Sequence, residues 1–174
     1  MITRRNLLAI GAVLAGRKAF AQSPSPSPSP SPISSSKSGL VVPNGSLLPS
    51  KVIAGVRVFH LRAEPIHHEI APGLAIDTWG YNGATPGPVI EATEGERVRI
   101  YVTNALPEPT SIHWHGVLVP NGMDGVGGLT QAPIAPGQTF RYEFVFDRAG
   151  TFMYHPHVDE MTQIREAEQG TQKT

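Results

Sequence analysis

The segment GERVRIYVTNAL, residues 95–106, decides the fold class because its apolar and polar side chains alternate. Successive side chains of a β-strand point to opposite faces, so alternation with a period of two predicts a half-buried strand. The two expected faces carry Val98, Ile100 and Val102 on one side, and Arg97, Arg99 and Thr103 on the other. This strand requires a core on one side only, which favours a sandwich or a barrel.

Short segments of similar character flank this strand on both sides. We expect a long bent strand over 56–70, interrupted at Pro65, then a turn at 71–73 and a partner strand from Leu74. Further strands are predicted at 111–117, 139–146 and 151–157, with a glycine-rich loop at 121–128. About seven strands, with 18 glycines and 17 prolines and no long helical periodicity, predict an all-β Greek-key β-sandwich.

The N-terminal 21 residues are predicted to be an export signal. Arg4 and Arg5 precede an apolar run from Leu7 to Ala15, which is much shorter than the roughly 20 residues that span a bilayer. The motif TRRNLL resembles the twin-arginine signal, and AFA before Gln22 offers a cleavage site. We therefore expect an exported, periplasmic protein. The alternative, a basic N-terminus ahead of a buried helix, lacks an amphipathic pattern.

Three further parts are expected after the signal. Residues 22–38 include SPSPSPSPSP, which favours an extended polyproline II spacer. Residues 39–163 have the length and patterning of one domain with its own core. Residues 164–174 form a polar tail without periodicity. The chain is thus predicted to be a signal, a linker, one β-sandwich domain and a tail.

Charge and cysteine content exclude several classes of function. Four of the 14 basic residues fall in the first 21 positions, and removing them leaves 10 basic against 14 acidic side chains, a net charge of −4. A mildly acidic body without a basic cluster gives no basis for nucleic-acid binding. The chain contains no cysteine, so disulfides, cysteine-ligated zinc, iron–sulfur clusters and thiolate-bound copper are excluded within it.

Two His-x-His pairs lie in predicted strands, His113 with His115 and His155 with His157. Residues i and i+2 of a strand share a face, so each pair projects two imidazoles together. Pro156 removes a ladder donor, which places the second pair where its strand ends. Four imidazoles without a thiol suit copper(II), with zinc as an open alternative. Histidines hydrogen-bonded in the core are the competing interpretation for either pair alone.

His67 and His68 are adjacent in sequence. Adjacent residues of a strand face opposite sides, so these two histidines cannot chelate one metal ion together. We expect them to be surface or turn residues.

The segments YNGATPGPVIEATEGERVRIYVTNAL, SIHWHG, DGVGGLTQAPIAPG and GTFMYHPHVDEM occur in an order and spacing that resemble the first cupredoxin domain of the multicopper oxidases. This family includes laccases and copper-resistance oxidases, and the resemblance covers about residues 52–163. It implies that His113 binds the type 2 copper, His115 and His155 one type 3 copper, and His157 the other. Asp124 matches the family's carboxylate for proton delivery, although an Asp-Gly pair also forms simple turns.

The family couples one-electron oxidation of phenols or metal ions to reduction of dioxygen to water. Its complete enzymes also use a His-Cys-His motif from a C-terminal cupredoxin domain, and this chain carries no such motif and ends in IREAEQGTQKT. We therefore expect a truncated or frame-shifted product with partial type 2 and type 3 copper sites, whose activity as an enzyme stays open. The alternatives are a non-catalytic exported copper-binding module and one subunit of a split oxidase, with a partner supplying the missing ligands. No membrane-spanning segment is expected.

Overall fold

The computed structural model describes residues 45–159 and residue 163, which belong to one compact unit, Leu40–Thr174. The predicted signal (1–21), spacer (22–38) and tail (164–174) lie outside the described residues. Within the described part of the chain, no helix is both long enough and apolar enough to cross a membrane. The limits of the predicted domain stay predictions.

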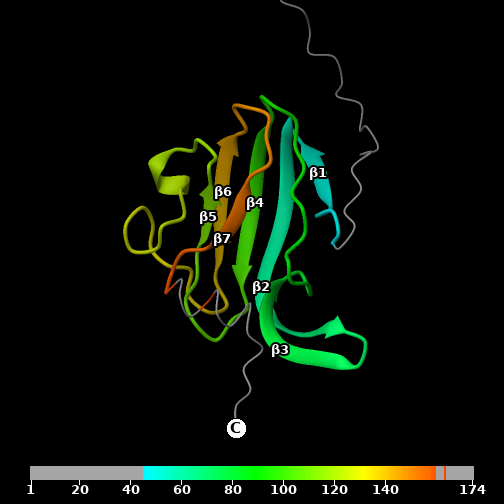
Figure 1. Cartoon of the computed structure of the whole chain (residues 1–174). Coiled ribbons are helices and arrows are strands. Elements are labelled where there is room, and N and C mark those ends of the chain that lie inside the picture. The colour runs from blue at the N-terminus through cyan, green and yellow to red at the C-terminus, as the bar shows by residue number, and fades with distance from the viewer. Residues whose placement is uncertain (1–44, 160–162, 164–174) are drawn as a thin grey trace, which may run out of the picture. The chain divides into compact units, whose positions relative to one another are not determined.

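Five strands form the larger sheet (Figure 1). They are β1 (Ser50–Ile53), β2 (Val56–Ala71), β3 (Leu74–Tyr81), β4 (Arg97–Asn104) and β6 (Thr139–Val145). The order is β1-β2-β4-β6, and β3 pairs with the C-terminal part of β2, residues 63–71. β2 and β4 run parallel, and the other pairs are antiparallel. β3 and the C-terminal part of β2 form a hairpin that extends away from the rest of the sheet (Figure 1).

Two short strands form the second sheet, β5 (Ile112–His115) and β7 (Met153–Pro156). They are antiparallel, and His113 lies opposite His155 in their register. The loop from β5 to β6 contains a single 3₁₀ turn, η1 (Asn121–Met123). The described elements are thus strands in two sheets with one short turn, which confirms the predicted all-β sandwich.

The core lies between the two sheets and follows the predicted alternation. Val98, Ile100 and Val102 of β4 are fully buried. From β5, the Trp114 ring packs against Tyr142 of β6, with 5.2 Å between ring centroids. The other buried members of this cluster are Leu48, Phe59, Leu61, Ile112, Ile134 and Phe144. Because Ile112 and Trp114 point into the core, the alternate residues of β5, His113 and His115, point away from it.

The observed strands differ from the predicted ones in ways that have local causes. β5 ends at His115 because Gly116 takes a left-handed conformation, with φ 81°, and the chain turns there. β7 ends at Pro156, as the missing N–H of proline predicted. β2 continues through Pro65, where β4 no longer pairs with it, so proline occupies an edge of the sheet.

Strand β1 was not predicted from the sequence. Its four residues, SKVI, show no alternation of buried and exposed positions, and Val52 and Ile53 are both about half exposed. Pairing with β2, rather than burial of one face, defines this strand. A search based on hydrophobic period has nothing to detect in such a segment.

Candidate metal centre

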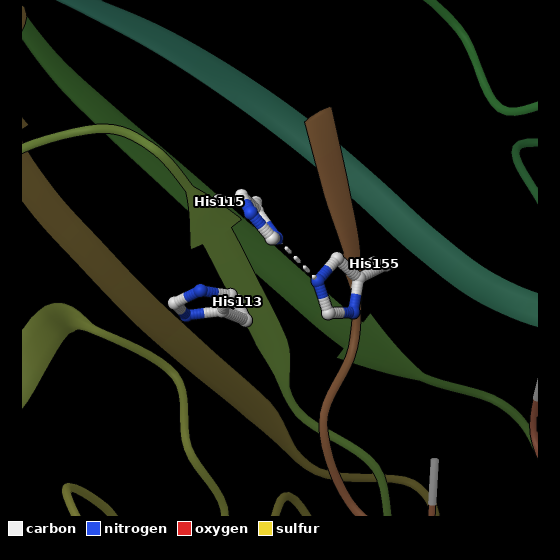
Figure 2. A group of neighbouring side chains, drawn as sticks. All are labelled: His113, His115 and His155. Carbon is white, nitrogen blue, oxygen red and sulfur yellow. Dashed lines mark hydrogen bonds between the residues drawn. The ribbon is translucent and has the colours of Figure 1, made fainter. Parts of the chain in front are cut away.

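The antiparallel pairing of β5 and β7 brings the two predicted histidine pairs together. His113 lies directly opposite His155, and His115 lies opposite Met153. The nitrogens that His113, His115 and His155 can offer to a metal ion all lie within 4.8 Å of one another. Figure 2 shows His115 and His155 facing each other from neighbouring strands, with His113 beside them. Three of the four predicted ligands therefore form a cluster.

The contact between His115 and His155 has the dimensions of a metal site. Nδ1 of His115 lies 3.4 Å from Nε2 of His155. Two nitrogen ligands at about 2.0–2.1 Å from a tetrahedral metal ion lie about 3.3–3.4 Å apart. The same contact also satisfies hydrogen-bond geometry, with one ring nitrogen donating and the other accepting. A metal ion held by both nitrogens would take the place of that shared proton, so the donor set fits a first-row transition-metal ion such as zinc or copper.

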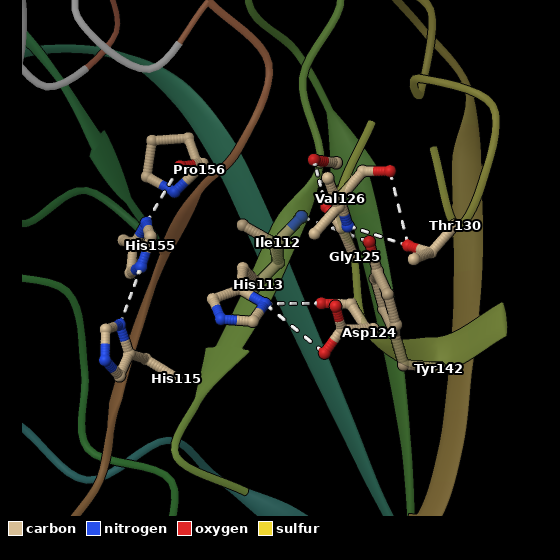
Figure 3. A network of polar contacts seen from close by, with 11 residues as sticks. Ile112, His113, His115, Asp124, Gly125, Val126, Thr130, Tyr142, His155 and Pro156 are labelled. Carbon is tan, nitrogen blue, oxygen red and sulfur yellow. Dashed lines mark hydrogen bonds and ion pairs between the residues drawn. The ribbon is translucent and has the colours of Figure 1, made fainter. Parts of the chain in front are cut away.

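Backbone carbonyls fix the ring orientation of two of the histidines (Figure 3). Nδ1 of His113 lies 2.7 Å from the carbonyl oxygen of Asp124, and Nδ1 of His155 lies 2.9 Å from that of Pro156. A carbonyl oxygen only accepts, so each Nδ1 carries a proton and donates it. In each neutral ring Nε2 then holds the lone pair, and this is the arrangement that metal-binding histidines use.

Asp124 contacts His113 mainly through its backbone. Its carboxylate Oδ1 lies 3.5 Å from Nδ1 of His113, farther than the backbone carbonyl oxygen, and the side chain is 32% exposed. The carboxylate was predicted to act at the site, whereas the role of the backbone carbonyl was not. A backbone carbonyl leaves no mark in a sequence, and the neighbouring glycine, Gly125, is the one available signal of an unusual backbone at this point.

The loop that carries Asp124 is tied directly to β5. Gly125 has φ 84°, and its carbonyl oxygen accepts a hydrogen bond of 2.5 Å from the Ser111 hydroxyl. Beneath this loop, the backbone N–H of Ile112 donates to the hydroxyl oxygen of Tyr142 at 3.1 Å. Burial raises the pKa of Tyr142 to about 12, so this hydroxyl is neutral at physiological pH. These bonds hold Ser111 and Ile112, the two residues before His113, in place.

His157 lies beside the cluster. Its ring centroid is 5.4 Å from that of His113 and 6.0 Å from that of His155. Its carbonyl oxygen accepts a hydrogen bond from the N–H of Gly127 at 3.2 Å, which ties the residue after β7 to the same loop. The structure thus places the fourth predicted ligand next to the rings of His113 and His155.

His67 and His68 lie elsewhere, on the hairpin of β2 and β3. They pair with Asp77 and Ile76 across the hairpin, and Nδ1 of His67 lies 2.8 Å from the Asp77 carboxylate. His67 is exposed. The exposure of His67 agrees with the prediction of a surface residue, whereas His68 is half-buried in the same strand.

Comparisons with known proteins point to one family. A family model described as multicopper oxidase matches residues 63–171. Copper resistance protein A of Pseudomonas syringae pv. tomato is 45% identical over 83 residues, which cover 48% of this chain and 14% of that protein. Multicopper oxidase MmcO of Mycobacterium tuberculosis is 45% identical over 86 residues, or 49% and 17% of the two chains. Laccase-1 of Botryotinia fuckeliana is 48% identical over 90 residues, or 50% and 16%.

Solved structures give the same result. A multicopper oxidase from Pseudomonas thermotolerans superposes with a TM-score of 0.62 at 40% identity, over 64% of this chain and 27% of that one. A metallo-oxidase from Campylobacter jejuni gives a TM-score of 0.65 at 34% identity, over 72% and 27%. The chain therefore spans a small part of these relatives. The matched residues 63–171 make up more than half of this chain, which belongs to the multicopper oxidase family.

Proposed function

We propose that this chain binds copper through His113, His115, His155 and His157 and forms one wall of the type 2/type 3 site of a laccase-like oxidase. The observation that carries the proposal is the 3.4 Å separation of the His115 and His155 nitrogens, with a His113 nitrogen in the same cluster. Imidazole sites bind copper(II) more tightly than its first-row neighbours, which supports copper over zinc.

We assign the individual coppers by resemblance to the family. His113 serves the type 2 copper, His115 and His155 serve one type 3 copper, and His157 serves the other. The short contact between His115 and His155 supports a shared ion for that pair. Copper bound here would supply Lewis acidity and redox capacity. The chain's own contribution is to hold the imidazoles in fixed orientations on β5 and β7, through the carbonyl oxygens of Asp124 and Pro156.

The Asp124 carboxylate is proposed to pass protons between solvent and the site. It is partly exposed and lies 3.5 Å from Nδ1 of His113, so it can reach both. Its proposed role concerns protons and does not include holding His113, because the backbone carbonyl already does this.

Copper titration of the purified chain tests the assignment. Replacing His115 and His155 together by alanine is expected to weaken copper(II) affinity at least about 100-fold, since even partners that only orient a ligand contribute about 10–100-fold. The matched control, His67→Ala with His68→Ala, is expected to bind like the wild type. Asp124→Asn is also expected to bind like the wild type, because the carbonyl remains. Equal affinity of the two double variants would overturn the site assignment.

A non-catalytic copper-binding module is the second candidate function. The absence of cysteine from the chain favours it, because a thiolate-bound copper then cannot form within this chain. A subunit that completes its site with another chain is a variant of the first candidate. The non-catalytic module and the oxidase, split or whole, share the copper ligands proposed above. They differ in whether oxygen is reduced at the site.

Export to the periplasm is a separate proposal that rests on TRRNLL and AFA in the first 21 residues. Mass spectrometry of the periplasmic fraction is expected to show a chain that begins at Gln22. Detection of the intact N-terminus alone, in the cytoplasm, would contradict it.

A further inference from the structure

A buried amide joins the two segments that carry the histidine pairs. The side chain of Gln163 is almost fully buried, with a relative exposure of 2% for the residue. Its Oε1 accepts a hydrogen bond of 2.7 Å from the Thr110 hydroxyl, and its Nε2 donates one of 2.7 Å to the carbonyl oxygen of Pro109. Both ends of the amide are therefore satisfied by a segment more than 50 residues earlier in the chain.

These contacts lie close in sequence to the proposed copper ligands. Thr110 comes three residues before His113, and Gln163 comes six residues after His157. Between His157 and Gln163 the chain turns at Asp159, which has a left-handed φ of 44°. Its carbonyl oxygen accepts a hydrogen bond of 3.0 Å from the Gln163 N–H. Gln163 thus limits how far the segment after β7 can move from the start of β5.

The small sheet needs such a contact because its own ladder is short. Only four residues of β5 pair with four of β7, whereas β4 pairs with seven residues of β2. Thr110 is itself held by two backbone hydrogen bonds with Ile134, of 3.0 and 2.7 Å. Because Ile134 holds Thr110 in place directly before β5, the hydrogen bond from Thr110 also restrains Gln163.

We propose that Gln163 is a positioning residue for the metal site: its hydrogen bond with Thr110 sets the placement of the β7 histidines against those of β5. This proposal rests on the copper-binding function proposed above and adds a residue to it. The competing explanation is that Gln163 only stabilises the fold. The two differ in whether loss of the contact changes the bound metal or only the free energy of unfolding.

Thr110→Val tests the proposal, because valine keeps the shape of threonine and removes the hydroxyl donor. We expect copper(II) affinity to fall on the order of tenfold, as for partners that orient metal ligands, and the EPR hyperfine splitting of bound copper(II) to change. Thr110→Ser keeps the hydroxyl and is expected to restore both. Ile100→Val, in the core on β4, is the stability control: it lowers the unfolding midpoint and leaves affinity and spectrum unchanged.

A measurement on the wild type keeps the test decisive if Thr110→Val does not fold. Coupling between two sites is reciprocal, so copper binding must also protect the Gln163 contact. Hydrogen exchange of the Gln163 side-chain amide, which donates to the Pro109 carbonyl oxygen, is expected to slow on copper binding by a larger factor than exchange of backbone amides in β4. Equal factors, or a Thr110→Val variant with wild-type affinity and spectrum, would overturn the positioning role. A wild type that binds no copper would instead refute the proposed function.

Discussion

Gly125→Ala is expected to destabilise the domain by more than about 4 kcal/mol, a loss that only severe packing or backbone defects produce. A Cβ at this position would overlap the Ile112 carbonyl group and lie 2.9 Å from the backbone nitrogen of His113. These are backbone atoms of β5 and cannot rotate away. Folded domains are stable by only about 5–15 kcal/mol, so this loss would remove a large fraction of the domain's free energy of unfolding. Urea denaturation followed by circular dichroism measures the loss.

Gly128→Ala is the matched control for this prediction. Gly128 lies in the same loop with nearly the same conformation, φ 83° against 84°, and a Cβ there would meet no atom within 4 Å. It should cost only the left-handed backbone strain of about 1–2 kcal/mol. Similar unfolding free energies for the two variants would show that the loop can move away from β5, and that the approach of Gly125 to Ile112 does not hold the site.

Gly125→Ala should affect the position of His113 before it affects the rest of the fold. The loop at Gly125 supplies the Asp124 carbonyl oxygen that orients His113 and the Gly125 carbonyl oxygen that binds Ser111. If the loop moves outward, both contacts lengthen together. Any folded fraction of Gly125→Ala is therefore expected to bind copper less tightly than Gly128→Ala does.

The sequence predicted the sheet elements whose side chains alternate. In β4 the buried positions are Val98, Ile100 and Val102, as the period of two requires. The pairing of His113 with His155 was beyond the sequence alone, because periodicity gives the faces of a strand and not its partner. The resemblance to a family made a shared copper site of the two histidine pairs an expectation, and the register of β5 and β7 then produced the cluster.

Other features could not be predicted because backbone geometry creates them. The ring of His113 is held by a carbonyl oxygen of Asp124, an atom that every residue possesses. Gln163 is a polar residue near the end of the predicted domain, and nothing in its neighbourhood in sequence indicates that its amide is buried against Thr110. Such contacts depend on long-range placement, which local propensity does not contain.

The copper-loaded 174-residue chain alone is not expected to oxidise phenols with dioxygen. A laccase-type cycle takes single electrons from substrate through a thiolate-bound copper, and the chain has no cysteine to form one. Its cluster is built on one pair of short strands, so the bound ions have fewer protein ligands than a closed site would give them. Oxygen consumption with a phenolic donor, and the visible spectrum, measure the outcome. Neither turnover nor an intense blue band is expected.

The controls decide what a different result would mean. A complete laccase assayed in parallel shows that donor and oxygen electrode work, and His115→Ala removes a proposed ligand from this chain. Sustained turnover that His115→Ala abolishes would show that the chain is a working oxidase and that the thiolate copper is dispensable. Turnover that His115→Ala leaves intact would indicate free copper in solution. Turnover that begins only when a second chain with a His-Cys-His motif is added would favour a split oxidase over a non-catalytic copper-binding module, because only the former has a use for the missing electron-accepting centre.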